Sequence, residues 1–572
     1  MSDARTSTYR TPPSRTFLIA HAALTALGVA CLFLPGKLTI RLVHLLPVAF
    51  TVRSGGTSLE AFAVLGPSII RRFGACLLLG VGLSTAWLVL PHTTVQRIAA
   101  TCRRACSLPH TSSRTRTLCR SVLLFAVPFA AFFWLSTPHN AFSTNSRIHW
   151  VDYLTLRSDV FFYAGGRIPH FLFYEHPSLW QGINAGLLAL TIDAILRRLS
   201  FGRWSAAALS LLFFGAGILL IFGDTGEDVL LNFLLLSLLL LSLTHHSALL
   251  RGLALALVVI GRPEFFSMFG AYLALMLYDL WCVRRSTDGD HESMRSRSIF
   301  HATVFGWAAA GVAASQVLFT IFGERYLFIN GQILDLGPLK DLKPITLDGF
   351  TISPFSGANF GHFLWVLPIG FTVCLAAFAI DLLPSRRRNE DPWPLRNLVA
   401  AFCIFATAAT VLLHELKPIE YLNVRYLAYT YPFVFVGGAV AIEGIRSRRP
   451  RSGVLLWTIA ISSLFVLPVH PLQHRDHLAA RIETQLFDHV DELRDARHDG
   501  IVVATFGGRS TKNAMAYVFR MAPGNVLLVK PVAAGTTPGS ILIVRRDQQV
   551  PPPPNATELF STSDLRVYRL AP

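Results

Sequence analysis

Long apolar blocks separated by short polar connections dominate the pattern along this chain from residue 120 onward. The blocks are apolar on every side rather than amphipathic, which is typical of helices surrounded by lipid or by other helices. We predict six membrane spans first, at 121–135, 179–195, 205–222, 229–243, 249–261 and 265–280. Five more follow, at 299–322, 363–383, 398–413, 426–442 and 453–469.

The positive charges orient these spans. Arginines cluster in alternate connections, at 97–120, 197–203, 284–297, 386–388 and 446–451. All of these connections fall on one side if the spans alternate, and the positive-inside rule makes that side cytoplasmic. The opposite side then holds the longer and more balanced loops, at 136–178, 223–228, 323–361 and 414–425.

The N-terminal part resembles a signal sequence, with Arg5, Arg10 and Arg15 before an apolar run at 17–35. No small-x-small cleavage site follows, so a retained signal anchor fits better. Two weak apolar runs around 42–52 and 58–70, and a clear span near 75–90, raise the total to about 13 to 15 spans. We therefore expect residues 1–118 to form a membrane segment of unclear role with a basic cytoplasmic loop, and 119–470 to form the transmembrane core.

An odd number of spans after residue 120 leaves 471–572 outside the cytoplasm as a small α/β domain. We predict a polar helix at 474–496 and strands at 501–506, 525–529, 541–545 and 565–570. The Gly507–Gly508 pair favours a plain turn over an anion-binding loop. Asn555 begins a glycosylation sequon of a kind that often occurs by chance. The expected fold is a polytopic α-helical membrane protein with this extracytoplasmic domain.

Composition excludes the soluble classes. Apolar residues make up 52% of the 572 residues and charged residues only 15%, against about 25% charged in soluble domains. The net charge of +17 comes from cations in the connections between spans, so nucleic-acid binding is not expected. Cys102, Cys106 and His110 lack a fourth ligand and metal-site spacing, which favours free thiols over a metal centre.

Most of the predicted spans lack ionisable residues at mid-membrane, where an ion-driven carrier needs them. Asp193 and Glu443 lie near cytoplasmic ends, where we expect them to reach water. Substrate chemistry is therefore expected in the outer loops.

The first outer loop carries three carboxylates in an aromatic-rich stretch, a composition that places it at the membrane interface. They are Asp152, Asp159 and Glu175, and His176 and Pro177 follow directly. Each carboxylate can instead pair with a nearby arginine, namely Arg147, Arg157 or Arg167.

Other outer connections place charge at the same depth. Glu227 lies in the acidic connection 223–228, and Arg262 joins two apolar runs. Lys417 and Arg425 lie in the last outer loop of the core, with Tyr426 opening the next span. Helix capping or snorkelling to the headgroups is the alternative reading for each of them.

Taken together, these motifs resemble the GT-C superfamily of polyprenyl-phosphate-dependent glycosyltransferases. The resemblance rests on the acid-bearing loop ending in Glu175, His176 and Pro177, on Thr225–Gly226–Glu227, on Arg262–Pro263–Glu264, and on Arg425–Tyr426. It is similar in layout to the bacterial arabinofuranosyl- and mannosyltransferases, which also end in a small periplasmic domain, and it covers roughly residues 121–570. Many relatives carry an adjacent pair of acids, whereas the acids here stand singly.

The resemblance implies an inverting transferase that moves a sugar from a polyprenyl-phosphate donor to a glycan, lipid or protein of the cell envelope. Nucleotide sugars are absent outside the cytoplasm, which also favours a lipid-linked donor. Asp152 is the expected base, with Asp159 second. Arg425, helped by Arg262 or Lys417, is expected to stabilise the departing phosphate.

Glu175 and His176 are expected to orient the acceptor, or else to begin the helix after Pro177. No cofactor is indicated, although a divalent cation bridging the outer acids and the donor phosphate stays open. The expected location is a bacterial inner membrane with a periplasmic C-terminal domain. Two alternatives stay open, namely a lipid or glycan translocase and a non-catalytic scaffold for envelope assembly.

Overall fold

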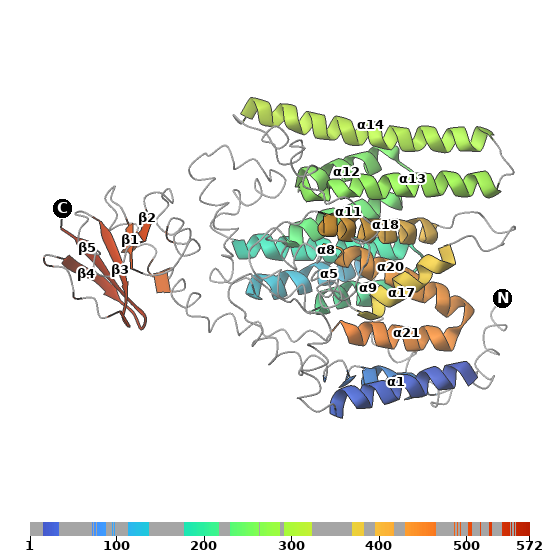
Figure 1. Cartoon of the computed structure of the whole chain (residues 1–572), viewed down its shortest axis with the longest axis horizontal. Coiled ribbons are helices and arrows are strands. Elements are labelled where there is room, and N and C mark those ends of the chain that lie inside the picture. Colours follow the sequence, from blue (N-terminus) through green and yellow to red (C-terminus); the bar gives the residue numbers. More distant parts are fainter. Residues whose placement is uncertain are drawn as a thin grey trace.

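The computed structural model describes residues 15–33, parts of 71–97, 113–135, 177–216, 229–261, 263–286, 291–322, 369–382, 395–416, 429–464 and parts of 485–571. These residues form a mostly helical bundle followed by a small C-terminal sheet, as Figure 1 shows. Each of the spans predicted after residue 120 overlaps a helix of the bundle.

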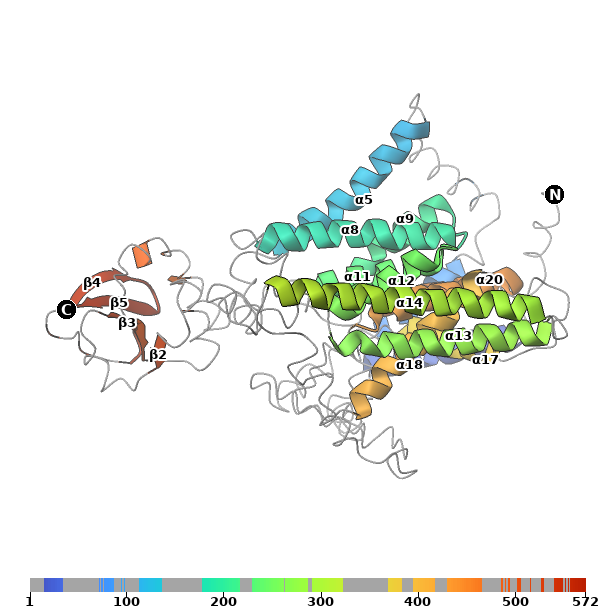
Figure 2. The same cartoon turned by 90° about the horizontal axis from the view of Figure 1, so that it is seen from above.

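Figure 2 shows α8, α13 and α14 lying along a common direction, with α5 tilted against them. The helices before residue 290 are α1 (Arg15–Phe33), α5 (Ser113–Leu135), α8 (Pro177–Arg198), α9 (Arg203–Leu212), η2 (Phe213–Gly215), α11 (Val229–Leu243), α12 (Ala248–Gly261), η3 (Pro263–Phe266) and α13 (Ser267–Ser286). The later ones are α14 (His291–Phe322), α17 (Ile369–Leu382), α18 (Leu395–Leu416), α20 (Tyr431–Arg448) and α21 (Pro450–Ser463).

Three of the described helices are long and apolar enough to cross a membrane, and they contain Thr117–Trp134, Leu179–Arg198 and His291–Ser315. The other apolar helices in the described ranges are shorter. The structure therefore describes a helical membrane protein.

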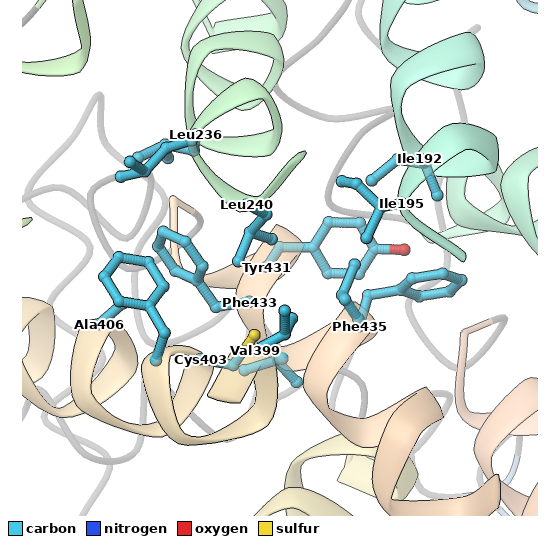
Figure 3. Close-up of a cluster of buried hydrophobic side chains, with 14 of the residues drawn as sticks. Ile192, Ile195, Leu236, Leu240, Val399, Cys403, Ala406, Tyr431, Phe433 and Phe435 are labelled. Carbon is cyan, nitrogen blue, oxygen red and sulfur yellow. The ribbon is translucent and has the colours of Figure 1, made fainter. Parts of the chain in front are cut away.

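The core of the bundle forms where α8, α11, α18 and α20 meet. Figure 3 shows Ile192 and Ile195 of α8 facing Leu236 and Leu240 of α11, with Tyr431 between the helices. All five side chains are fully buried. Burying a side chain of this size contributes about 1.5–3 kcal/mol in water, but between membrane helices close packing supplies more of the stabilisation.

Glycines allow the closest helix contacts. A Cβ atom added at Gly186 of α8 would lie 2.5 Å from the Phe125 ring of α5, and one at Gly182 would lie 3.0 Å from Phe129. Residues with increasing numbers along α8 thus contact residues with decreasing numbers along α5. The two helices are therefore antiparallel. The end of α5 and the beginning of α8 therefore lie at the same end of the bundle.

The contact between α12 and α14 depends on Gly252, and we expect Gly252→Ala to destabilise the protein by about 1–3 kcal/mol. The added Cβ would lie 2.4 Å from the Trp307 Cβ and 2.6 Å from the Val304 carbonyl oxygen, so backbone must shift. Thermal unfolding in detergent measures the loss. Gly306→Ala on α14 is the matched control, because no atom lies within 4 Å of its added Cβ. Equal unfolding temperatures for the two variants would contradict the prediction.

The N-terminal helix α1 packs with the short helix Leu77–Ala86. The Thr85 hydroxyl and the His21 Nε2 atom lie 3.1 Å apart. A small apolar cluster of Phe17, Val81 and Leu455 connects both helices to α21. The predicted apolar run at 17–35 is thus a helix, which ends at Phe33.

The C-terminal sheet has five strands in the order β2-β1-β3-β5-β4. They are β1 (Val502–Ala504), β2 (Val526–Leu528), β3 (Ile541–Arg545), β4 (Ala556–Ser561) and β5 (Leu565–Leu570). Strand β1 pairs in parallel with β2 and β3, whereas β5 is antiparallel to β3 and β4. Four of the strands match the predicted runs.

Strand β4 was missed by the sequence reasoning, which treated this stretch only as a sequon. Its burial alternates weakly because it is an edge strand paired on one side, with a register shift between Glu558 and Phe560. The described residues that precede the sheet pack against it. The Gln485 Nε2 donates to Asp564 at 2.6 Å, and the His489 ring stacks on Phe560 at 4.1 Å.

Candidate functional site

All the predicted site residues lie outside the residues that the structure describes. They are Asp152, Asp159, Glu175, His176, Glu227, Arg262, Lys417, Arg425 and Tyr426. The Gly507–Gly508 pair and the Cys102, Cys106 and His110 group also lie outside. The structure does describe the helix ends next to the predicted site residues, and these helix ends contact one another.

The beginning of α11, the end of α12 and the turn before α20 meet at Tyr429. The Asn232 Nδ2 of α11 donates to the Tyr429 Oη at 3.4 Å. The Phe265 ring of η3 lies edge-on to Tyr429 at 5.1 Å, and Phe233 does so at 5.9 Å. A Cβ at Gly261 would lie 2.6 Å from Leu235, so the end of α12 also contacts α11.

The 3-10 helix η2 and the end of α5 also lie in this region. The Tyr431 hydroxyl donates to the Phe213 carbonyl oxygen of η2 at 2.7 Å. Phe214 then contacts Phe132 near the end of α5, with ring centroids 5.7 Å apart. Because α8 begins beside the end of α5, the helix ends that border Glu175, Glu227, Arg262 and Arg425 all belong to one end of the bundle.

Helix α20 begins at Tyr431, five residues later than the predicted start at 426. Tyr426 itself lies outside the described residues. Pro432 lies in the first turn of the helix, where its fixed φ angle and missing N–H are tolerated. Pro177 occupies the corresponding place in α8, as predicted.

Basic residues gather at the opposite end of the bundle. Arg396 of α18 donates to the carbonyl oxygens of Leu199 and Ser200, at 2.7 and 3.2 Å. Arg251 of α12 donates to the Leu243 carbonyl at 2.8 Å, which satisfies the C-terminal end of α11. Both arginines therefore stabilise helix ends.

His245, in the turn between α11 and α12, lies among these cations. Partial burial lowers the pKa of His245, and the charges of Arg198, Arg251 and His246 lower it further. This turn thus carries a local excess of positive charge.

Asp193 does not reach water as expected. It is 2% exposed and accepts hydrogen bonds from Arg120 of α5 and from the Nε of Arg197. Glu443, also expected to reach water, is paired with Arg446 at 2.5 Å and is 17% exposed. The correction for Asp193 has a simple cause, since α5 covers this face of α8.

Helices α12, α13 and α14 share a buried polar network. Its charged residues stand near the ends of the predicted spans 249–261, 265–280 and 299–322 rather than at mid-membrane. The His301 Nε2 lies 2.9 Å from the Asp279 Oδ2, and its Nδ1 lies 3.0 Å from the Tyr272 Oη. The charge of Arg251 acts on Tyr272 from close by. All four side chains are less than 5% exposed.

The order of donors in this network follows from the Asp279 carboxylate, which can only accept. The His301 Nε2 therefore carries the proton that Asp279 accepts, and the Nδ1 of the neutral imidazole accepts from the Tyr272 hydroxyl. The network runs from a cation to an anion, and the charges of Arg251 and Asp279 compensate each other. The sequence did not reveal the network, because Asp279 and His301 each look like an isolated polar residue at the edge of an apolar run.

Among the described residues, no group of three or more His, Cys, Asp or Glu side chains is arranged to hold a metal ion. The helix ends next to the predicted site residues meet around Tyr429, at one end of the bundle.

Comparison with known proteins gives two results. No protein-family model matches the chain, and no curated protein matches it. Among solved structures, ArnT from Cupriavidus metallidurans bound to undecaprenyl phosphate is similar with a TM-score of 0.45 and 9% identity, covering 80% of this chain and 98% of that one. ArnT in the apo state gives 0.36 and 12%, with the same coverage. A likeness at this level assigns no residue and no activity to this chain.

Proposed function

We propose that this chain is an inverting glycosyltransferase that moves a sugar from a polyprenyl-phosphate donor to a cell-envelope acceptor, at the outer face of a bacterial inner membrane. The observation that carries the proposal is the meeting of α11, α12 and α20 at Tyr429. Glu227 precedes α11 by two residues, Arg262 follows Gly261 directly, and Arg425 precedes Tyr429 by four. Each residue of chain spans at most about 3.8 Å, so these short chain distances allow the three residues to act at one site.

The proposed reaction needs one base and one phosphate site. Asp152, or Asp159 in its place, takes the proton from the acceptor hydroxyl. The acceptor oxygen then forms a bond to the anomeric carbon, while the bond from that carbon to the phosphate oxygen breaks. Arg425, with Arg262 or Lys417, stabilises the departing polyprenyl phosphate. Glu175 and His176, directly before α8, orient the acceptor.

The position of the C-terminal sheet supports the proposed orientation. Figure 1 shows the sheet beyond the end of the bundle at which α8 begins. The arginine-rich connections belong to the opposite end, which the positive-inside rule assigns to the cytoplasm. We propose that the sheet lies in the periplasm, on the same side as the transfer site.

Purified full-length protein in nanodiscs, incubated with a panel of synthetic polyprenyl-phosphate sugars and a membrane-extract acceptor, tests the proposal. We expect release of polyprenyl phosphate from one donor, with inversion at the anomeric carbon of the product. A donor that binds without turnover under any acceptor condition would contradict transferase activity. Failure of every donor to bind would contradict the lipid-linked substrate as well.

A translocase is the second candidate. The buried network of Arg251, Tyr272, Asp279 and His301 lies at the basic end of the bundle, where Arg251 binds the Leu243 carbonyl, so it gives an ion-driven carrier no group at mid-membrane. Movement of a fluorescent lipid-linked sugar across proteoliposomes, compared with and without a pH gradient, separates this function from transfer.

A further inference from the structure

The turn between α11 and α12 gathers three nitrogen-bearing side chains at the surface of the basic end of the bundle. Arg198, the last residue of α8, and His246 are exposed, and His245 is partly buried. Figure 3 shows Ile195 of α8 facing Leu240 of α11, and each helix ends three residues further on. The end of α8 therefore comes out of the bundle beside the turn.

The positive charge of this turn is not balanced by an acid. The charges that act on His245 are all positive, and after partial burial they lower its pKa further. Among the described residues, no carboxylate pairs with Arg198, whereas the preceding Arg197 pairs with Asp193 at 2.8 Å. Like charges held together in a partly dry place repel one another, and a bound anion would relieve that repulsion.

Hydrogen bonds that do not involve the three exposed or partly exposed side chains hold the backbone of the turn in place. The Arg251 Nε and Nη2 atoms donate to the carbonyl oxygens of His245 and Leu243, at 3.1 and 2.8 Å. The His245 N–H donates to the Ser242 carbonyl at 3.0 Å. A ligand of the turn would therefore need little further ordering of the chain, which favours binding.

Apolar surface begins directly after the turn. Leu249, Leu253 and Leu257 of α12 are 40, 39 and 51% exposed, and their spacing of four residues places them on one face of the helix. Such a row of leucines suits the acyl chains of lipids. Trp204, in the first turn of α9, is also exposed, and tryptophan is enriched where the membrane meets water. The turn thus lies at headgroup depth, with the leucine row leading into the membrane.

The chemistry of the turn and of the leucine row selects one class of ligand. A phosphate ester accepts hydrogen bonds from a guanidinium group and from imidazole N–H groups, and even a neutral imidazole donates one. A soluble phosphate would leave the leucine row unused. A zwitterionic lipid would bring a second positive group to a turn that already has an excess of them.

We propose that Arg198, His245 and His246 bind the phosphate of an anionic phospholipid, whose acyl chains lie along the leucine row of α12. Basic pockets between membrane helices bind anionic headgroups in the same way. This site lies at the opposite end of the bundle from the proposed transfer site, so the inference does not depend on the proposed function.

The test titrates purified full-length protein in detergent with phosphatidylglycerol and measures bound lipid by native mass spectrometry. Phosphatidylcholine with the same acyl chains and glycerol 3-phosphate are the comparison probes. Arg198→Gln should weaken phosphatidylglycerol binding about 5-fold, the effect expected for one cation. His245→Ala with His246→Ala should weaken it as well, whereas Arg198→Lys should keep most of the affinity. Wild type should prefer phosphatidylglycerol to phosphatidylcholine and should not bind glycerol 3-phosphate at the same concentrations.

Arg284→Gln is the matched control, because Arg284 is exposed near the end of α13 and is not among the charges that act on His245. This variant should bind phosphatidylglycerol as wild type does. Equal weakening by Arg284→Gln and Arg198→Gln would overturn the site, since the basic surface as a whole would then attract the lipid. Equal binding of the two lipids by wild type, a comparison that needs no variant to fold, would overturn the anionic headgroup. Glycerol 3-phosphate binding as tightly as phosphatidylglycerol would overturn the lipid as the source of the phosphate.

Discussion

Asp152→Ala should reduce sugar transfer at least about 100-fold, because the acceptor hydroxyl would lose the group proposed to take its proton. Asp152→Asn should be as inactive, since an amide keeps the size of the carboxylate but has neither its charge nor its basicity. Initial rates of polyprenyl-phosphate release, measured on matched amounts of folded protein, give the comparison. Binding of the donor should change little in both variants.

The control for Asp152 is Asp547→Asn in the C-terminal sheet. Asp547 is exposed and paired with Arg545, with one carboxylate oxygen 3.0 Å from the Arg545 Nε atom. The Asp547→Asn substitution therefore removes the same charge far from the bundle core. Transfer by this variant should equal that of wild type. Near-normal transfer by Asp152→Asn would show that the carboxylate is not the base, and Asp159 would then be the residue to replace.

The spans of the bundle could be predicted because a membrane helix requires a long apolar stretch, which is visible in the local sequence. Helix α11 was predicted to the residue at 229–243, and β3 and β5 were predicted with their full lengths. Helix ends were harder. The start of α20 depends on Pro432 and on the packing of Tyr431 against Phe213, which lies more than 200 residues earlier in the chain.

Pairing of buried polar groups could not be predicted, because the partners come from different helices. Asp279 and His301 each look like an isolated polar residue at the edge of an apolar run. Only the packing of α13 against α14 brings the two side chains to 2.9 Å. The same holds for Asn232 and Tyr429, which are separated by 197 positions. The loop residues chosen from motif order stay predictions, supported by the helix ends that border them.

The buried network leads to the second large effect, which concerns stability. Removing Asp279 leaves the His301 Nε2–H without its acceptor and takes away the negative charge that acts on Arg251 through space, in a region with almost no exposed surface. Leaving a buried polar group without its partner costs about 1–3 kcal/mol, and more for a charged group. We therefore expect Asp279→Ala to lower the unfolding temperature in detergent by several degrees or to prevent folding.

Arg297→Ala is the matched control, because Arg297 lies 3.8 Å from the same carboxylate but is half exposed. An exposed partner contributes only about 0–1 kcal/mol, so this variant should unfold close to wild type. The double variant Asp279→Leu with Arg251→Leu removes both charges together, and should be more stable than either single variant. If Asp279→Ala unfolded no earlier than Arg297→Ala, the carboxylate would not be compensating Arg251. The charge of Arg251 would then have to be balanced by a group other than Asp279.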